Sequence, residues 1–178
     1  MKLINWFSPL ILAFTLFACG NGGTNFVTEE IDGEFSIDVP DYMAHLDMQN
    51  PDANLQFGNE LEQHFVMVIS ESHEELAEYG LELDIQSYAD LSMDFLEMSI
   101  TDPEIEQIGD GIVMLNGMEA IGYKIRGVFP ENNSSIFYYA MFYRSDKSFY
   151  YITTWTLGEK EEKFAENMEI ITHSLKQL

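Results

Sequence analysis

The sequence predicts an α+β fold, an α/β/α sandwich in which helices cover both faces of a central antiparallel sheet. Three observations predict this class. Short segments that alternate apolar and polar residues are separated by turn residues, the long segments of the second half are apolar on both faces, and two amphipathic helical segments lie in the middle and at the end of the chain. A sheet that is apolar on both faces needs helices on each side, so we expect the order β-β-β-α-β-β-β-β-α.

The first strands are expected before residue 70. Residues 35–39 alternate apolar and polar side chains and stop at Pro40, which indicates a strand that ends in a turn. Residues 43–46 and 55–57 are weaker strand candidates on either side of the Asn50-Pro51 turn. Residues 64–70 are almost continuously apolar, which is typical of a central strand.

Helices are expected next, a short one over residues 74–79 and a longer one over residues 85–98. Asp84 is a suitable N-cap for the longer helix, and Pro103 ends the segment. The 3.6-residue period predicts one apolar stripe, with the acidic residues Asp90, Asp94 and Glu97 turned away. The stripe comprises Ile85, Tyr88, Leu91, Phe95 and Met98.

The second half reads as successive hairpins followed by a closing helix. Asn116-Gly117 is the preferred type I′ turn between strands 112–115 and 118–129. Residues 130–135 then lead to strand 136–144, and Asp146-Lys147 leads to strand 149–156. A helix is expected from about Glu159 to the end. Its apolar stripe comprises Phe164, Met168, Ile171, Leu175 and Leu178.

The turns allow the register of the hairpins to be estimated. One face then gathers Ile121, Tyr123, Ile125, Tyr138, Ala140, Phe142, Phe149 and Tyr151, and the other gathers Lys124, Arg126, Phe137, Tyr139, Met141 and Tyr143. This register sets Arg126 opposite Tyr139 and Lys124 beside Met141 and Tyr143. Two interpretations stay open: structural cation–π contacts, or a small partner-binding patch formed by Lys124, Arg126, Tyr139 and Tyr143.

The first residues resemble the signal peptide of a bacterial lipoprotein. Lys2 supplies a basic start, residues 3–17 are mostly apolar, and Ala18 precedes Cys19, the single cysteine of the chain. We expect residues 1–18 to be removed, residues 19–30 to form a lipidated cysteine and a flexible tether, and residues 31–178 to form the folded domain. The alternative is an uncleaved membrane helix, which would need about 20 apolar residues.

A lone cysteine in an exported protein cannot form an internal disulfide, and lipid attachment explains its position. Acyl chains such as palmitate on Cys19 would anchor the protein, since each buried CH₂ contributes about 0.8 kcal/mol. The lipid bilayer is therefore the first expected partner. The expected location is the bacterial cell envelope, with the domain facing the periplasm or the cell surface.

Charge is distributed unevenly along the chain. The sequence has 31 acidic and 8 basic residues, a formal net charge of −23, and no Lys or Arg between Lys2 and Lys124. Such a field repels nucleic acid and anionic lipid and favours a cationic partner or loosely held divalent ions. The alternative is that the acidic residues serve only solubility.

No arrangement of residues predicts catalysis or a cofactor. Nucleophile elbows, phosphate-binding glycine loops and paired cysteines are absent from the sequence. Among the histidines, only His73 lies among carboxylates, but Ala77 occupies the place of the second histidine of a His-Glu-x-x-His metal motif. We therefore expect no metal site and no enzyme. A metal-assisted hydrolase that uses His73 stays the catalytic alternative.

Several features together resemble the PsbP-like superfamily, in particular its DcrB-type bacterial lipoproteins. They are residues 35–40 (FSIDVP), the strand 65–69 that runs into Glu71-Ser72, the turn 116–120 (NGMEA), the strand pair with Phe142-Tyr143 and residues 150–153, and the closing amphipathic helix. The resemblance implies an α/β/α sandwich and a role in binding or assembly rather than catalysis. The function expected is a membrane-tethered envelope binding module whose partner is an envelope protein, and charge favours a cationic one. An acidic structural lipoprotein without a specific ligand is a further alternative.

Overall fold

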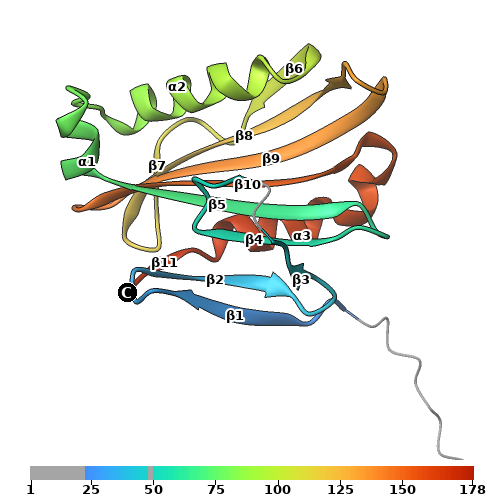
Figure 1. Ribbon diagram of the computed structural model, residues 1–178, viewed down its shortest axis with the longest axis horizontal. Coiled ribbons are helices and arrows are strands. Elements are labelled where there is room, and N and C mark those ends of the chain that lie inside the picture. Colours follow the sequence, from blue (N-terminus) through green and yellow to red (C-terminus); the bar gives the residue numbers. More distant parts are fainter. Residues whose placement is uncertain (1–22, 48–49) are drawn as a thin grey trace, which may run out of the picture.

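The structure is a computed structural model that describes residues 23–47 and 50–178. Two helices interrupt the series of antiparallel strands, and a third helix and a short last strand close it (Figure 1). The strands are β1 Phe26–Ile31, β2 Phe35–Pro40, β3 Ala44–His45, β4 Leu55–Asn59, β5 His64–Ser72, β6 Thr101–Gln107, β7 Val113–Leu115, β8 Met118–Phe129, β9 Ser134–Arg144, β10 Ser148–Leu157 and β11 Lys176–Gln177. The helices are α1 His73–Glu78, α2 Ile85–Glu97 and α3 Glu161–His173, with a 3₁₀ turn at Gly158–Lys160 before α3.

The main sheet has eight strands, and every pairing in it is antiparallel. Its order is β3-β4-β5-β10-β9-β8-β6, and β7 also pairs with β8. A separate three-stranded sheet has the order β1-β2-β11. The antiparallel sheet flanked by helices confirms the α+β sandwich predicted from the sequence.

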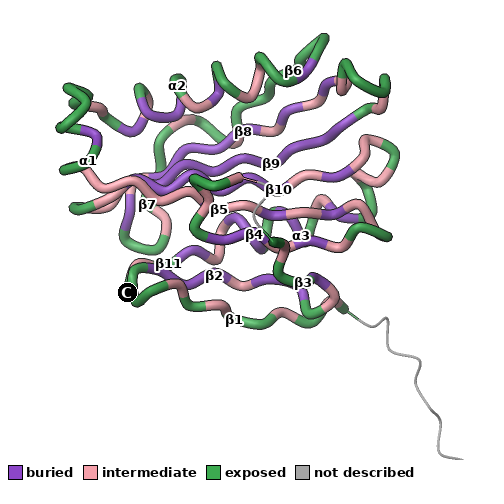
Figure 2. Tube along the Cα trace, viewed as in Figure 1, coloured by how far each residue is buried: buried purple, intermediate pink, exposed green. Residues whose placement is uncertain are grey.

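Two hydrophobic cores lie on opposite faces of the main sheet. Helices α1 and α2 cover one face, whereas α3 and the small sheet lie over the other (Figure 1). Figure 2 shows the strands between these layers as the most continuously buried part of the chain. On the α3 side, Phe137, Tyr139, Met141 and Tyr143 of β9 are buried, and Tyr138, Ala140 and Phe142 are buried on the α2 side. The two faces are those predicted from the hairpin pattern.

The N-terminal boundary of the fold differs from the prediction. Residues 26–30 were expected to belong to the tether, but Phe26–Ile31 forms strand β1 and pairs along its whole length with β2. The Asn167 amide also donates a hydrogen bond to the Thr24 hydroxyl at 2.9 Å. Residues 26–30 therefore belong to the folded part of the chain, where backbone pairing holds side chains that are half-buried or exposed.

Strand β6 was not predicted. Every residue of Thr101–Gln107 is exposed, and Pro103 interrupts the segment, so its sequence has no apolar alternation. It pairs with β8 as an edge strand, with a register irregularity between Thr101 and Glu104. Proline and acidic side chains are typical protections of an exposed sheet edge.

The closing helix is shorter than expected. α3 ends at His173, and the Asn116 side-chain amide donates hydrogen bonds of 2.8 Å to the backbone oxygens of His173 and Leu175. The chain then forms the short strand β11 beside β2. Leu175 is buried as predicted, but Leu178 lies beyond the helix and is exposed.

Candidate functional site

The main sheet is wider than the helices that cover it. A helix is about 10 Å across and neighbouring strands are about 4.8 Å apart, so one helix covers roughly two strands. α2 packs on β8, β9 and β10, which leaves the same face of β5 only partly covered. The side chains of β5 differ in burial accordingly. Val66 and Val68 are fully buried toward α3, and Met67 and Ile69, which point to the α2 side, are only half-buried.

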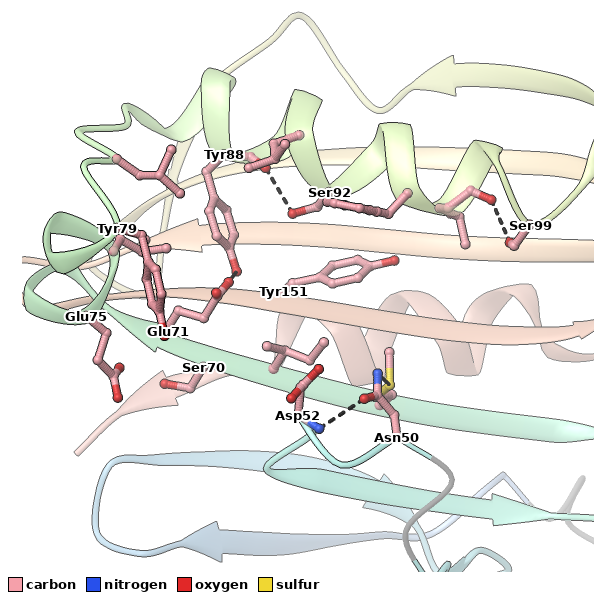
Figure 3. Close-up of a pocket in the computed structure, with 17 residues that line it drawn as sticks. Asn50, Asp52, Ser70, Glu71, Glu75, Tyr79, Tyr88, Ser92, Ser99 and Tyr151 are labelled. Atoms are coloured by element: carbon pink, nitrogen blue, oxygen red, sulfur yellow. Dashed lines mark hydrogen bonds between the residues drawn. The ribbon is translucent and has the colours of Figure 1, made fainter.

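A pocket of about 810 Å³ lies at this uncovered part of the sheet, and we call it the α2 pocket. Its lining comes from α1 and α2, from β5 and β10, and from the segment that precedes β4 (Figure 3). Tyr151 of β10 lies under α2 in this view. Asn50 and Asp52 lie across β5 from α2, at the far edge of the pocket. The volume is in the range typical of ligand and peptide pockets.

Most of the lining is apolar. α2 presents Leu91 and Phe95 to the pocket, and Tyr79 follows α1. Phe95 is 68% exposed and Tyr79 is 82% exposed, which is unusual for large apolar side chains gathered at one place. The pocket therefore offers apolar surface that the fold itself does not cover.

The exposed side chains of α2 belong to the apolar stripe that the sequence predicted. Ile85 and Tyr88 are buried as expected, but the helix faces the sheet with Ala89 and Met93, and Leu91, Phe95 and Met98 are exposed. The prediction that all five stripe residues face the core is therefore wrong for these three. They lie on the flank of α2 because the helix carries more apolar surface than a single sheet-facing side can bury.

The charged side chains of the α2 pocket are all acidic. Asp52, Glu71 and Glu75 line it, and no Lys, Arg or His does. Glu71 is half-buried at the end of β5, and its Oε2 accepts a hydrogen bond of 2.8 Å from the hydroxyl of Tyr88. Burial first, and the charge of Glu71 second, raise the pKa of Tyr88. Within the described residues Glu71 has no ion pair.

Glu75 is held ionised by the start of α1. Its Oε2 accepts a hydrogen bond of 3.0 Å from the backbone amide of Ser72, and the Ser72 hydroxyl accepts one of 3.1 Å from the amide of Glu75. This capping box lowers the pKa of Glu75 through the hydrogen bonds of Ser72. The pocket thus combines exposed apolar side chains with fixed negative charge.

The residues predicted as a partner patch do not form an accessible surface. Tyr139 is 1% exposed and Tyr143 is fully buried, and the Tyr143 hydroxyl donates a hydrogen bond of 2.7 Å to the backbone oxygen of Thr172. The register also differs by two residues, since Lys124 is opposite Tyr139 and Arg126 is opposite Phe137. Tyr139 and Tyr143 therefore offer no accessible surface to a partner, because α3 covers both rings.

The two cations of that set have structural contacts instead. Lys124 Nζ lies 5.7 Å from the ring centroid of Tyr139, and Arg126 Cζ lies 5.2 Å from that of Phe137. Arg126 forms a two-pronged ion pair with Glu161 at the start of α3, with Nε donating to Oε2 at 2.9 Å. The hydrogen bond that Arg126 donates to Glu161 raises the pKa of Arg126. These contacts fit the cation–π interpretation, with different partners from those expected.

His73 does not lie in a metal-binding arrangement. Its ring packs at 4.8 Å from Phe149, and its Nε2 is buried without a hydrogen-bond partner. Burial lowers the pKa of His73, and the charge of Arg144 adds to this. Across residues 23–47 and 50–178, no three His, Cys, Asp or Glu residues come together as metal ligands would. The hydrolase alternative has no assembled site around His73.

Cys19 and the whole expected signal peptide lie outside the described residues. None of the helices in the described part of the chain has the length and apolar character that crossing a bilayer requires.

Comparison with solved structures identifies the fold. No protein-family model matches the sequence, and no curated protein matches it. Cyanobacterial PsbP (CyanoP) from Synechocystis sp. PCC 6803 superposes with a TM-score of 0.57 at 12% identity, over 92% of this chain and 99% of its own. LpqN of Mycobacterium tuberculosis, a protein involved in cell envelope biogenesis, has a TM-score of 0.56 at 12% identity, over 80% of this chain and 82% of its own.

The Ran-binding protein Mog1p of Saccharomyces cerevisiae also superposes, with a TM-score of 0.56 at 11% identity over 86% of this chain and 95% of its own. At these identities the likeness concerns the fold. The chain has a PsbP-like fold, as the resemblance in its sequence implied.

Sequence reasoning missed the α2 pocket. Two signals pointed to it: β5 is apolar on both faces, and the apolar surface of α2 extends to Leu91, Phe95 and Met98. Both were interpreted as core, because the sequence alone does not show which strands the helix covers.

Proposed function

We propose that this chain is a lipid-anchored, non-catalytic binding module of the bacterial cell envelope, and that the α2 pocket holds a segment of a protein partner. The observation that carries the proposal is the pocket itself, in which Tyr79, Leu91 and Phe95 remain exposed and every charged lining residue is acidic. Such a surface is costly in water unless a partner covers it.

The anchor in this proposal is an acylated Cys19, formed after removal of residues 1–18. Because β1 begins at Phe26, the tether is short. A flexible tether of about six residues spans about 13 Å on average. The domain, residues 26–178, would therefore sit close to the lipid surface, facing the periplasm or the cell surface.

The binding role is supported by the fold and by the chemistry of the pocket. LpqN is involved in cell envelope biogenesis and Mog1p is a Ran-binding protein, so related folds serve in an envelope process and in protein binding. The pocket brings together one half-buried carboxylate and apolar side chains, without an assembled base, nucleophile and metal set among the described residues. Holding a partner is the task that such a lining performs best.

The test compares capture of partners from envelope membranes by matched variants. Phe95→Asp places a charge in the pocket, whereas Val27→Asp places the same charge at another exposed apolar residue, on β1 in the layer beyond α3. We expect a protein captured by the wild type and by Val27→Asp to be lost with Phe95→Asp. Equal capture by both variants, or no capture above a charge-matched control protein, would contradict the proposal.

A further inference from the structure

We propose that the segment bound in the α2 pocket is basic and apolar: it places the ammonium or guanidinium of a Lys or Arg against Glu71 and seats neighbouring apolar side chains on Phe95 and Leu91. This inference rests on the proposed function and names the chemistry of the partner at the same site. It follows from the charge and exposure of the lining residues.

Glu71 is the first reason. Its carboxylate is half-buried between α1, α2 and β5, accepts one hydrogen bond, from Tyr88, and has no ion pair within the described residues. A partly desolvated carboxylate gains more from a cation than an exposed one does, because fewer water molecules and less dielectric screening compete with it. A bound Lys or Arg would supply the missing opposite charge.

The surrounding charge points to the same ligand. Asp52, before β4, and Glu75 of α1 flank Glu71 in the pocket lining. The lining segments that precede residue 124 contain no Lys or Arg, because the chain has none between Lys2 and Lys124, and β10, which contributes Tyr151, contains none either. The field across the pocket therefore has one sign, and it attracts cations while it repels anionic groups.

The apolar lining sets the second requirement. Leu91 and Phe95 are separated by one turn of α2, and Phe95 is mostly exposed. A cation alone leaves these side chains in water. A segment that carries apolar side chains next to its Lys or Arg would cover them, at about 25 cal/mol per Å² of buried apolar surface.

Two other occupants fit less well. A second copy of this chain would bring more negative charge to an acidic pocket, since the net charge of each copy is −23. An anionic lipid surface is repelled for the same reason. The partner favoured by charge complementarity is therefore a protein segment rich in Lys or Arg and in apolar residues.

The test uses three labelled twelve-residue peptides and the full-length protein in a non-ionic detergent. One peptide combines Leu and Lys in an amphipathic helical pattern, the second replaces each Lys by Glu, and the third keeps each Lys and replaces each Leu by Ser. Binding is measured by fluorescence anisotropy at physiological salt. We expect the Leu/Lys peptide to bind at least about tenfold more tightly than either of the others, since both its charge and its apolar side are needed.

Matched variants locate that binding. Glu71→Gln keeps the shape of the side chain and still accepts the hydrogen bond of Tyr88, and we expect it to weaken binding of the Leu/Lys peptide about tenfold. Glu131→Gln removes the same charge from the exposed connection between β8 and β9 and controls for net charge. Phe95→Ser should weaken binding by a similar factor, and Ile170→Ser, on exposed surface of α3, should not.

The outcomes separate the inference from the function on which it rests. Equal effects of Glu71→Gln and Glu131→Gln, or equal binding of the Ser/Lys peptide, would overturn the inference, because net charge alone would then explain binding. Preference for the Leu/Glu peptide with the same dependence on Phe95 would also overturn it, yet would leave the pocket as a partner site. A stable dimer that Phe95→Ser dissociates, measured by analytical ultracentrifugation, would assign the pocket to a second copy and overturn the inference.

Discussion

The hydroxyl of Tyr88 in α2 donates a hydrogen bond of 2.8 Å to Glu71 at the end of β5. The ring of Tyr88 also stacks on Phe149 of β10, with centroids 4.5 Å apart. One side chain thus ties the helix to two strands and orients the carboxylate of the α2 pocket (Figure 3). This contact couples the stability of the helix layer to the geometry of the candidate site.

Replacing Tyr88 by Phe keeps the stacking and removes the donor to Glu71. We expect the free energy of unfolding to fall by about 1 kcal/mol, because a typical hydrogen bond of this kind contributes about 0.5–1.5 kcal/mol. Thermal unfolding should show a decrease in Tm of about 2–4 °C. Tyr79→Phe is the control, since Tyr79 is 82% exposed, and an equal decrease in both variants would contradict the role given to the Tyr88 hydroxyl.

The ion pair between Arg126 and Glu161 is expected to hold β8 to the start of α3 rather than to bind a partner. Arg126→Met keeps packing over Phe137 and removes the charge. We expect a loss of about 0.5–1 kcal/mol, since both side chains are partly exposed to solvent and screened. A double-mutant cycle with Glu161→Gln, measured by denaturant unfolding, should give a coupling energy that decreases in high salt. A coupling energy of zero would show that the pair is not stabilising.

His64 should make the fold sensitive to acid. Its ring is fully buried, lies 4.4 Å from Phe164 by centroids, and its Nδ1 is 2.8 Å from the Tyr42 hydroxyl. Burial lowers the pKa of His64 to about 3, and the charge of Lys163 acts in the same direction. The unfolded chain, with an ordinary histidine pKa of about 6.5, therefore binds a proton between these values that the folded chain does not.

Stability consequently decreases as the pH falls below about 6.5, by up to about 1.4 kcal/mol per pH unit from this residue. Between pH 6.5 and pH 5, we expect the wild type to lose about 1.5 kcal/mol more of its free energy of unfolding than His64→Asn does, measured by urea unfolding. Most carboxylates remain ionised in this pH range, so they contribute little to the difference. In the wild type, NMR of the ring nitrogens should find His64 neutral at pH 5. A charged ring at that pH would disprove the assignment, whether or not the variant folds.

We expect Cys19→Ser to release the protein from membranes, because the proposed function places the acyl chains on Cys19. Cell fractionation should find the variant in the soluble fraction instead of the envelope pellet. Ser8→Ala, which changes the expected signal peptide and keeps the cysteine, is the control and should stay in the pellet. A Cys19→Ser variant that still sediments with the envelope after a carbonate wash would refute the lipid anchor.

The sequence predicted the hairpins well because their signals are local. β8 begins and ends where the pattern predicted, at Met118 and Phe129, and the alternation along β8 and β9 assigned each side chain to the correct face. The pairing of β8 with β9 was wrong by two residues, since Arg126 lies opposite Phe137. A shift by two keeps every side chain on its face, so the hydrophobic pattern does not reveal it.

Features that depend on the arrangement of distant elements could not be predicted in this way. β6 is held by backbone pairing with β8, and its side chains, including Ile105, stay exposed. Tyr139 and Tyr143 carry the composition of a binding surface, but α3 buries them. The α2 pocket exists because α2 packs on β8, β9 and β10 and leaves β5 partly open, which no local pattern records.

Photocrosslinking in living cells tests the central claim most directly. An unnatural amino acid with a photoreactive side chain replaces Phe95 in the pocket, and in a separate variant it replaces Ile170 on α3, at an exposed apolar position away from the pocket. The account predicts one discrete crosslinked protein partner from position 95 and none from position 170, with the crosslink weakened by Glu71→Gln. The same crosslinks from both positions, or none from position 95, would contradict a partner site beneath α2.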